Sequence, residues 1–253
     1  MLLAKDIKAI FYDLDGTLRF NDPPWRDIFA DEAVRLGVSI GAEDRLRAAR
    51  WEHYYFAGSN EVRMDDAEFP DSKAFWLNFN RRQLVALGAS PDLVEELGPR
   101  LREYMDEHHE SLDTLMPGVQ QALSALKDAG LILGVISNRD TPYQEYLLQI
   151  GLAEYFDFSV AAGEVKSWKP DKAIFEHALR MAGVQAEETV YVGDNYFADV
   201  VGARNAGLKA ILLDAHGVFD QPDCPVVASH EELLDLLEGG GIFEMVKKRI
   251  PLG

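Results

Sequence analysis

Short apolar runs alternate with amphipathic segments over the second half of this chain, and this alternation restricts the fold most. It predicts strands at residues 131–136, 156–160, 189–192 and 210–213, with a short edge strand at 226–227. Helices are predicted between them at 119–130, 141–151, 170–183, 199–206 and 231–237, the second opened by a capping box over Thr141–Gln144. Alternating strands and helices form a parallel sheet with right-handed crossovers. The fold class is therefore α/β with a Rossmann-like parallel sheet.

The first strand of this core comes from the N-terminus, where Ile7–Ile10 is an apolar run. A long helical stretch then interrupts the core. Helices are expected at 25–36, 44–56, 71–87 and from the cap Ser90 towards His109, with hardly any strand among them. We therefore expect residues 1–18 and 113–253 to form the Rossmann-like core. Residues 19–112 would form an inserted all-helical cap domain.

Polar side chains gather where the predicted strands end: Asp13 and Asp15, Ser137 and Asn138, and Asp194 with Asp199 five residues further. The carboxyl ends of parallel strands meet at one edge of the sheet, where such folds bind ligands. Each of these residues taken alone is also a common turn or cap residue. Together, up to four carboxylates at one edge require a hard cation. Oxygen ligands without histidine favour Mg²⁺.

Asp13 and Asp15 alone already indicate a special site. Two like charges held about 4 Å apart repel by about 4 kcal/mol at an effective dielectric constant of 20. A metal ion or a shared proton relieves this repulsion. Lys169, next to Pro170 at a predicted helix start, can neutralise a carboxylate and an incoming phosphate together. Lys166 is the competing candidate, and a solvated side chain is the ordinary alternative for either lysine.

Four segments in order resemble the motifs of the haloacid dehalogenase-like superfamily. Asp13-Leu14-Asp15-Gly16-Thr17-Leu18 is similar to its first motif, Ser137-Asn138 to its second, Lys169-Pro170 to its third and Gly193–Asp199 to its fourth. The helical insertion between the first and second motifs is similar to the cap domain of the phosphatase branch of that family. The resemblance covers the whole predicted core.

The resemblance implies a role for each matching residue. Asp13 would be the nucleophile that forms a phospho-aspartyl intermediate, and Asp15 the general acid and base. Mg²⁺ would be held by Asp13, the backbone carbonyl of Asp15 and Asp194. Ser137 and Asn138 would bind the phosphoryl oxygens, and Lys169 would pair with the nucleophile and the phosphoryl group. Asp199 would orient Lys169 or a metal-bound water.

The resemblance leaves other activities open. Hydrolytic dehalogenases of this family need no metal and lack an acid at the position of Asp15, so a 2-haloacid dehalogenase is the weaker alternative. A sugar phosphomutase shares all four motifs and is the main rival. A non-catalytic binding module has no need of the second acid. The expected activity is that of a Mg²⁺-dependent phosphatase acting on a small phosphate ester.

Composition limits the partners of the chain. Its 43 acidic and 25 basic residues give a formal net charge of −18, which repels nucleic acid and anionic membranes. The single cysteine, Cys224, cannot form an internal disulfide, which fits a reducing compartment. Only Met1–Ala4 is apolar at the N-terminus, too little for a signal sequence. We therefore expect a cytoplasmic monomer or homodimer.

Overall fold

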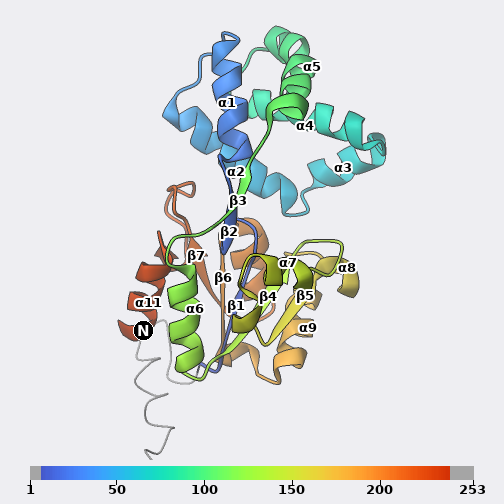
Figure 1. Cartoon of the computed structure of the whole chain (residues 1–253). Helices are drawn as coiled ribbons and strands as arrows, with labels where there is room; N and C mark the ends of the chain where they lie inside the picture. The colour runs from blue at the N-terminus through green and yellow to red at the C-terminus, as the bar shows by residue number, and fades with distance from the viewer. Residues whose placement is uncertain (1–6, 240–253) are drawn as a thin grey trace, which may run out of the picture. The chain divides into compact units, whose positions relative to one another are not determined.

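The computed structural model describes residues 7–239 of the 253-residue chain (Figure 1). The chain divides into two compact units. One contains the chain up to Phe20 and again from Leu115, and the other runs from Asn21 to Thr114. We call the first the α/β unit and the second the helical unit. The two-stranded sheet of β2 (Arg19–Asp22) and β3 (Leu112–Leu115) lies where the chain passes between them.

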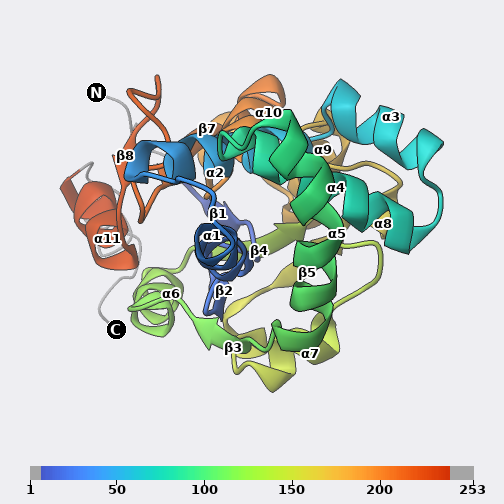
Figure 2. The same ribbon diagram turned by 90° about the horizontal axis from the view of Figure 1, so that it is seen from above.

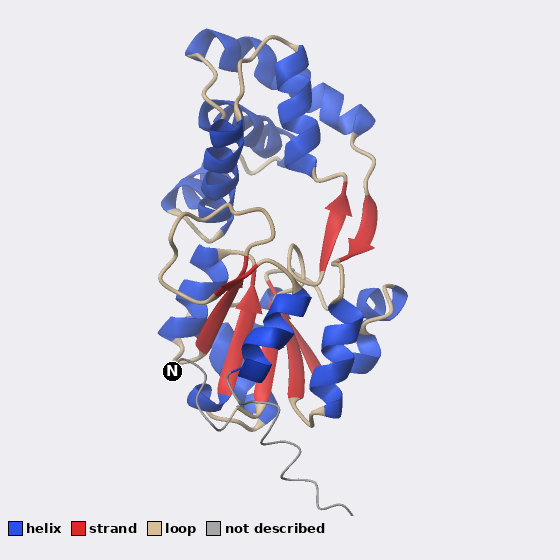
Figure 3. Cartoon of the chain, turned by 90° about the vertical axis from the view of Figure 1, so that its left-hand side faces the viewer, coloured by secondary structure: helices blue, strands red, loops and turns tan. Residues whose placement is uncertain are grey.

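The α/β unit is built on a six-stranded sheet in the order β5-β4-β1-β6-β7-β8, and every neighbouring pair is parallel (Figure 3). Its strands are β1 (Ala9–Tyr12), β4 (Ile132–Ser137), β5 (Phe158–Ala161), β6 (Thr189–Gly193), β7 (Lys209–Leu213) and β8 (Val226–Val227). This confirms the predicted fold class. The register aligns Tyr12 with Val135 on one side and with Val192 on the other.

Successive side chains of β1 enter two different cores, because side chains alternate across a strand. Ile10 and Tyr12 belong to one apolar cluster, whereas Ala9 and Phe11 belong to the other. Helices α6 (Val119–Asp128), α7 (Gln144–Gln149) and α11 (His230–Gly239) contribute to the first core. Helices α9 (Lys172–Ala182) and α10 (Val201–Asn205) contribute to the second. Figure 2 shows α6 and α11 on the opposite side of β1 from α9 and α10. Both faces of the sheet are therefore covered.

Local details differ from the prediction at three helix starts. The expected capping box at Thr141 is wrong, because α7 begins after Tyr143 without a side-chain cap. Helix α9 begins at Lys172 and not at Pro170, and Asp171 caps it by accepting a hydrogen bond from the N–H of Ala173. A π-helical turn over Tyr196–Val200 precedes α10, so the helical segment begins before Asp199. The unit also has a short helix α8 (Ala162–Val165) and 3-10 turns at Ala153–Tyr155 and Ala186–Glu188.

The sheet order reverses direction at β1. From β1 the chain moves to β4 and β5 on one side and then returns to β6, β7 and β8 on the other. At such a switch point the two sets of crossover helices diverge, leaving a ligand crevice at the carboxyl ends of the central strands. We therefore expect a ligand site at the carboxyl ends of β4, β1 and β6.

The helical unit contains five helices within the described residues: α1 (Trp25–Arg35), α2 (Ala42–Phe56), α3 (Asn60–Glu68), α4 (Ser72–Ala86) and α5 (Pro91–His108). Its core includes Phe29, Leu84 and Leu101. Helix α3 was not expected from the sequence. Asp71 caps α4 through the N–H of Ala74. In the described part of the chain, none of the helices combines the length and apolar character needed to span a membrane.

Candidate active site

Three neighbouring strands place polar residues at this edge of the sheet. Asp13 follows β1 directly, Ser137 is the last residue of β4, and Asp194 follows Gly193 at the end of β6. The backbone N–H of Asp13 donates to the carbonyl of Val192 at 2.9 Å, so pairing with β6 continues into the first motif. Because β1 lies between β4 and β6, these three side chains leave the sheet side by side.

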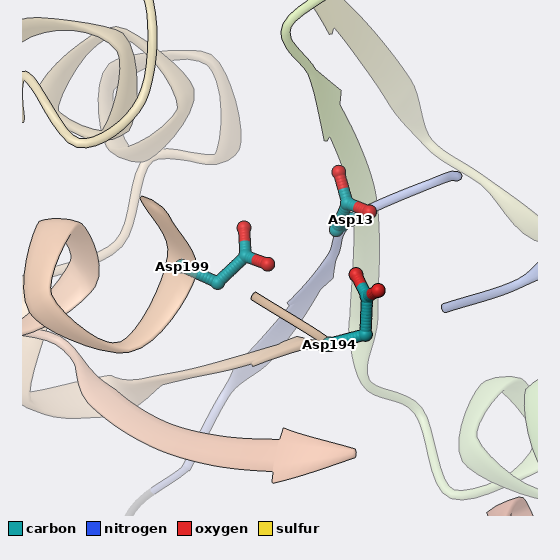
Figure 4. Close-up of side chains that lie close together, drawn as sticks. All are labelled: Asp13, Asp194 and Asp199. Atoms are coloured by element: carbon teal, nitrogen blue, oxygen red, sulfur yellow. The ribbon is translucent and has the colours of Figure 1, made fainter. Parts of the chain in front are cut away.

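The carboxylates of Asp13, Asp194 and Asp199 form a compact group. Each contributes one oxygen to a set whose members all lie within 4.8 Å of one another, and Figure 4 shows them facing a common space. The hydroxyl oxygen of Thr17 lies 3.3 Å from an oxygen of Asp13 and 3.3 Å from one of Asp194. It can donate its single proton to only one of them at a time. The group therefore concentrates negative charge at the end of the sheet.

Lys169 neutralises part of this charge from a buried position. Its Nζ donates to Asp13 Oδ1 at 2.5 Å, to Asp199 Oδ1 at 2.7 Å and to the hydroxyl of Tyr191 at 3.0 Å. These three partners use all three protons of the ammonium group. One cation thus faces two buried carboxylates, which leaves one negative charge unbalanced even before Asp194 is considered.

The electrostatics follow from this imbalance. Burial raises the pKa of Asp13 from 3.8 to about 7; the charges of Asp199 and Asp15 add to the rise, and Lys169 opposes it. Burial by itself would lower the pKa of Lys169, but the carboxylates of Asp13 and Asp199 outweigh it and raise this pKa. The lysine therefore stays charged. The aspartate is the group whose ionisation depends on what else binds.

Asn138 fixes the backbone of Lys169. Its side-chain NH₂ donates to the carbonyl of Lys169 at 3.0 Å, and its side-chain oxygen accepts from the N–H of Lys169 at 2.7 Å. The side-chain amide of Asn138, a residue predicted to bind phosphate, is therefore engaged in aligning the lysine. Ser137 is buried, and its Oγ accepts from the N–H of Arg139 at 3.3 Å, so its own hydroxyl proton remains to be donated. Lys166, the competing lysine, is exposed.

Asp15 lies apart from the carboxylate group and is 41% exposed. Its two oxygens accept from Arg139, Oδ2 from Nε at 3.0 Å and Oδ1 from Nη2 at 2.9 Å. Arg19 Nη1 lies 3.3 Å from Oδ1. The two predicted catalytic aspartates therefore differ in surroundings: Asp13 is buried beside a lysine, and Asp15 is partly exposed between two arginines.

Asp199 is the most enclosed of the acids, with 1% of its surface exposed. Its Oδ1 accepts from Lys169 and from the hydroxyl of Tyr191 at 3.2 Å, and its Oδ2 accepts from the N–H of Asn195 at 2.9 Å. A Cβ on Gly193 would lie 2.3 Å from the Asp199 carboxylate, so only glycine fits there. Both Asp199 oxygens are thus already bonded, which suits holding Lys169 better than binding a metal ion directly.

Sequence reasoning did not identify Tyr191, Arg139 or Thr17 as site residues. Tyr191 resembles any apolar strand residue, and only the sheet register brings its hydroxyl beside Lys169. Arg139 directly follows the Ser137-Asn138 motif, and this adjacency was the one available signal. Thr17 stood inside the first motif, but its contact with Asp194 spans 177 residues of sequence.

The donor set suits a hard divalent cation. Asp13 and Asp194 supply carboxylate oxygens without sulfur or nitrogen, which is the chemistry that Mg²⁺ prefers. A Cβ on Gly16, whose φ is +89°, would lie 2.2 Å from Asp194 Oδ2. The backbone of the first motif therefore approaches the Asp194 carboxylate more closely than any side chain would permit. The unbalanced charge around Asp13 adds a reason for a cation to bind.

Comparisons with known proteins agree on one family. Residues 7–207 match the family model described as haloacid dehalogenase-like hydrolase. The chain is 32% identical over 213 residues to the glyceraldehyde 3-phosphate phosphatase of Methanothermobacter thermautotrophicus, covering 83% of this chain and 86% of that protein.

Two solved structures extend the comparison. A HAD phosphatase from Thermococcus onnurineus has 25% sequence identity and a TM-score of 0.55, covering 92% of this chain and 99% of that one. A 2-haloacid dehalogenase from Pseudomonas syringae pv. Tomato DC3000 has 28% identity and a TM-score of 0.53, again covering 92% and 99%. The sequence-based resemblance is therefore confirmed.

Proposed function

Because the chain belongs to the haloacid dehalogenase-like hydrolases and is a phosphoric monoester hydrolase, we propose that it dephosphorylates a small metabolite through a phospho-aspartyl intermediate, with Mg²⁺ as cofactor. The observation that carries this proposal is the buried Asp13 carboxylate, held 2.5 Å from Lys169 and opposite Asp194. A dehalogenase has no use for the metal-binding oxygens or for a second acid at Asp15.

The proposed reaction has two displacements at phosphorus. An oxygen of Asp13 attacks, the bond to the ester oxygen breaks, and Asp15 gives its proton to the leaving alcohol. Asp15 then takes a proton from the water that attacks the phospho-aspartate, and inorganic phosphate leaves. Asp15 suits both steps because it is exposed enough to exchange protons with solvent and substrate.

The other residues position and neutralise. Lys169 holds Asp13 in place and offers positive charge to the transferring phosphoryl group. The Ser137 hydroxyl donates to a phosphoryl oxygen. Asn138 acts through the backbone of Lys169. Asp199 orients Lys169. Mg²⁺, held by Asp13, Asp194 and the backbone carbonyl of Asp15, would neutralise the charge that develops on the phosphoryl oxygens.

We assign the role of cap domain to the helical unit. The helical unit runs from Asn21 to Thr114, and the inserted cap expected from the sequence runs over residues 19–112. A cap supplies the residues that choose the leaving group and excludes bulk water during the reaction.

The decisive test is phosphate release from a panel of phosphorylated metabolites, with and without Mg²⁺, by the native chain and by Asp13→Asn. The native chain should be active only with Mg²⁺, and the variant should be inactive while keeping its circular dichroism spectrum. Retained turnover by the variant would exclude the covalent mechanism. Measuring sugar phosphate isomers alongside phosphate distinguishes a mutase, and halide release from 2-chloropropionate distinguishes a dehalogenase.

A further inference from the structure

Two arginines converge on the carboxylate of Asp15 within the α/β unit. Arg139 binds both of its oxygens, and Arg19 lies near one of them. The flat guanidinium of Arg139 thus meets a flat anion edge to edge, the arrangement with which arginine recognises carboxylates and phosphates. In a chain with a formal net charge of −18, two cations here share one anion.

The scaffold, and not Asp15 alone, holds these guanidinium groups. The Cζ atom of Arg139 lies 4.3 Å from the centre of the Tyr146 ring and 5.8 Å from that of Tyr143, and Arg19 Cζ lies 6.0 Å from Tyr146. Tyr143 is itself fixed, because its buried hydroxyl lies 3.0 Å from the carbonyls of both Val135 and Val160. A cation stacked on such rings keeps its place when its anion moves.

The proposed chemistry requires Asp15 to give up part of this pairing. Both of its oxygens accept from Arg139, yet one of them must reach the ester oxygen and later a water. Because Asp15 would protonate the leaving group, Arg139 and Arg19 also lie on the leaving-group side of the phosphoryl group. The Arg139 side chain is 29% exposed, and its guanidinium needs a new anionic partner when Asp15 moves away. The substrate is bound at that step and can supply this anion.

We propose that Arg139 and Arg19 bind a second anionic group on the leaving group, so that the preferred substrate is a phosphomonoester that also carries a carboxylate or a further phosphate. This inference rests on the proposed phosphatase function and narrows its substrate class. The carboxylate of Asp15 occupies the place of the substrate anion when no substrate is bound. The incoming anion displaces it, and Asp15 turns to the ester oxygen.

The test uses three probes that share a three-carbon chain: 3-hydroxypropyl phosphate, 3-(phosphonooxy)propanoate and propane-1,3-diyl bisphosphate. The native chain should hydrolyse at least one anionic probe with a kcat/KM about 10-fold or more above the neutral probe, because charge-assisted hydrogen bonds are the strong ones. A preference for the second or the third probe identifies the anion as carboxylate or phosphate. Equal kcat/KM for all three would overturn the inference and leave the phosphatase function standing. No phosphate release from any of them or from p-nitrophenyl phosphate would instead refute the function.

Variants separate anion binding from positioning of Asp15. Arg139→Gln should reduce the ratio of anionic to neutral kcat/KM to about 3 or less, mainly through KM of the anionic probe, and Arg139→Lys should be intermediate since it keeps the charge but loses the fork. An equal loss on all three probes would show that Arg139 acts only through Asp15. Arg204→Gln removes a surface arginine that pairs with Asp223 at 2.7 Å and should leave the ratio unchanged. If Arg139→Gln does not fold, the test rests on the ratio of anionic to neutral kcat/KM in the native chain and on its reduction in Arg19→Gln.

Discussion

Replacing the proposed nucleophile should stabilise the metal-free protein at alkaline pH. In Asp13→Asn the amide oxygen can still accept from Lys169 at the position of Oδ1, and the amide NH₂ at the position of Oδ2 can donate to the hydroxyl oxygen of Thr17. The negative charge disappears, however, and Lys169 then faces a single carboxylate, Asp199, 2.7 Å away. The native chain has one positive charge, on Lys169, beside two carboxylates, whereas the variant has one positive charge beside one carboxylate.

The structure gives the sign and the size of the effect. The folded protein keeps the proton of Asp13 up to about pH 7, whereas the ordinary pKa is 3.8, so the folded state binds more protons between these values. Stability therefore falls as pH rises from about 4 to about 7, and the full cost is present above that range. At about 1.36 kcal/mol for each pKa unit, this cost is at most about 4 kcal/mol. Relaxation and entering water reduce it, so we expect about 2–4 kcal/mol.

The assay is thermal unfolding of the native chain and of Asp13→Asn in EDTA at pH 4 and pH 8. At pH 8 the variant should unfold about 4–16 °C higher, given about 2–4 °C for each kcal/mol in a chain of this size. At pH 4 the two should coincide. Millimolar Mg²⁺ should stabilise the native chain more than the variant, because a cation gains more from an ionised Asp13.

The control is Asp31→Asn, which removes an exposed carboxylate from a surface ion pair with Arg45 at 2.6 Å. Such pairs contribute about 0–1 kcal/mol, and we expect no marked pH dependence. An equal shift for Asp13→Asn at both pH values, or a lower melting temperature at pH 8, would refute the reasoning from charge imbalance.

Three further substitutions test other parts of the structure. Tyr191→Phe keeps the ring but leaves one proton of the Lys169 ammonium without its acceptor. The value of kcat/KM for phosphate release should therefore fall about 10-fold, and the free energy of unfolding should fall by about 1–3 kcal/mol. Unchanged kinetics would show that Tyr191 does not position Lys169. Gly16→Ala inserts a Cβ against Asp194 and should weaken Mg²⁺ affinity by about 10- to 100-fold, measured by calorimetric titration. Asp65→Asn removes the charge of a buried carboxylate that pairs with the partly exposed Arg82, whose Nε lies 2.6 Å from Oδ2, and should destabilise the helical unit by about 1–3 kcal/mol. Asp66→Asn, at its exposed neighbour, should have little effect on the melting temperature.

The sequence predicted the sheet well because its strands are buried on both faces. Apolar runs such as Ile132–Ser137 and Thr189–Gly193 leave few other structures open, and the residues that follow them must emerge at one edge. Helix α3 escaped prediction for the opposite reason. Its segment Asn60–Glu68 carries five charged residues, and the one that is buried is Asp65, bonded to Arg82 and Tyr55. Periodicity of apolar residues does not reveal a helix whose buried residue is an aspartate.

Some features of the site could likewise be predicted from the sequence, and others could not. The placement of Asp13, Ser137 and Asp194 follows from topology, because each ends a neighbouring strand of a parallel sheet. The partners of Lys169 and Asp15 depend instead on the directions of individual side chains. The resemblance of Ser137-Asn138 to the second family motif predicted Asn138 as a phosphate ligand, yet its side-chain amide bonds both backbone groups of Lys169, 31 residues away. Nothing in the sequence spacing distinguishes an amide aimed at a substrate from one aimed at a neighbouring loop.

The two aspartates of the first motif, Asp13 and Asp15, show why the directions of side chains matter for function. Their sequence context is nearly the same, two carboxylates in one short loop, and repulsion between them was the first sign of a site. In the structure the two carboxylates differ in their counter-charges, and this difference supports the different roles proposed for them. A buried lysine that is shared with Asp199 suits a nucleophile that needs a further cation to stay ionised. The two partly exposed arginines that lie against tyrosine rings suit a general acid whose ion pairs must break during each turnover. The same arginines form a positive site on the leaving-group side, and an anionic group of the substrate can occupy that site.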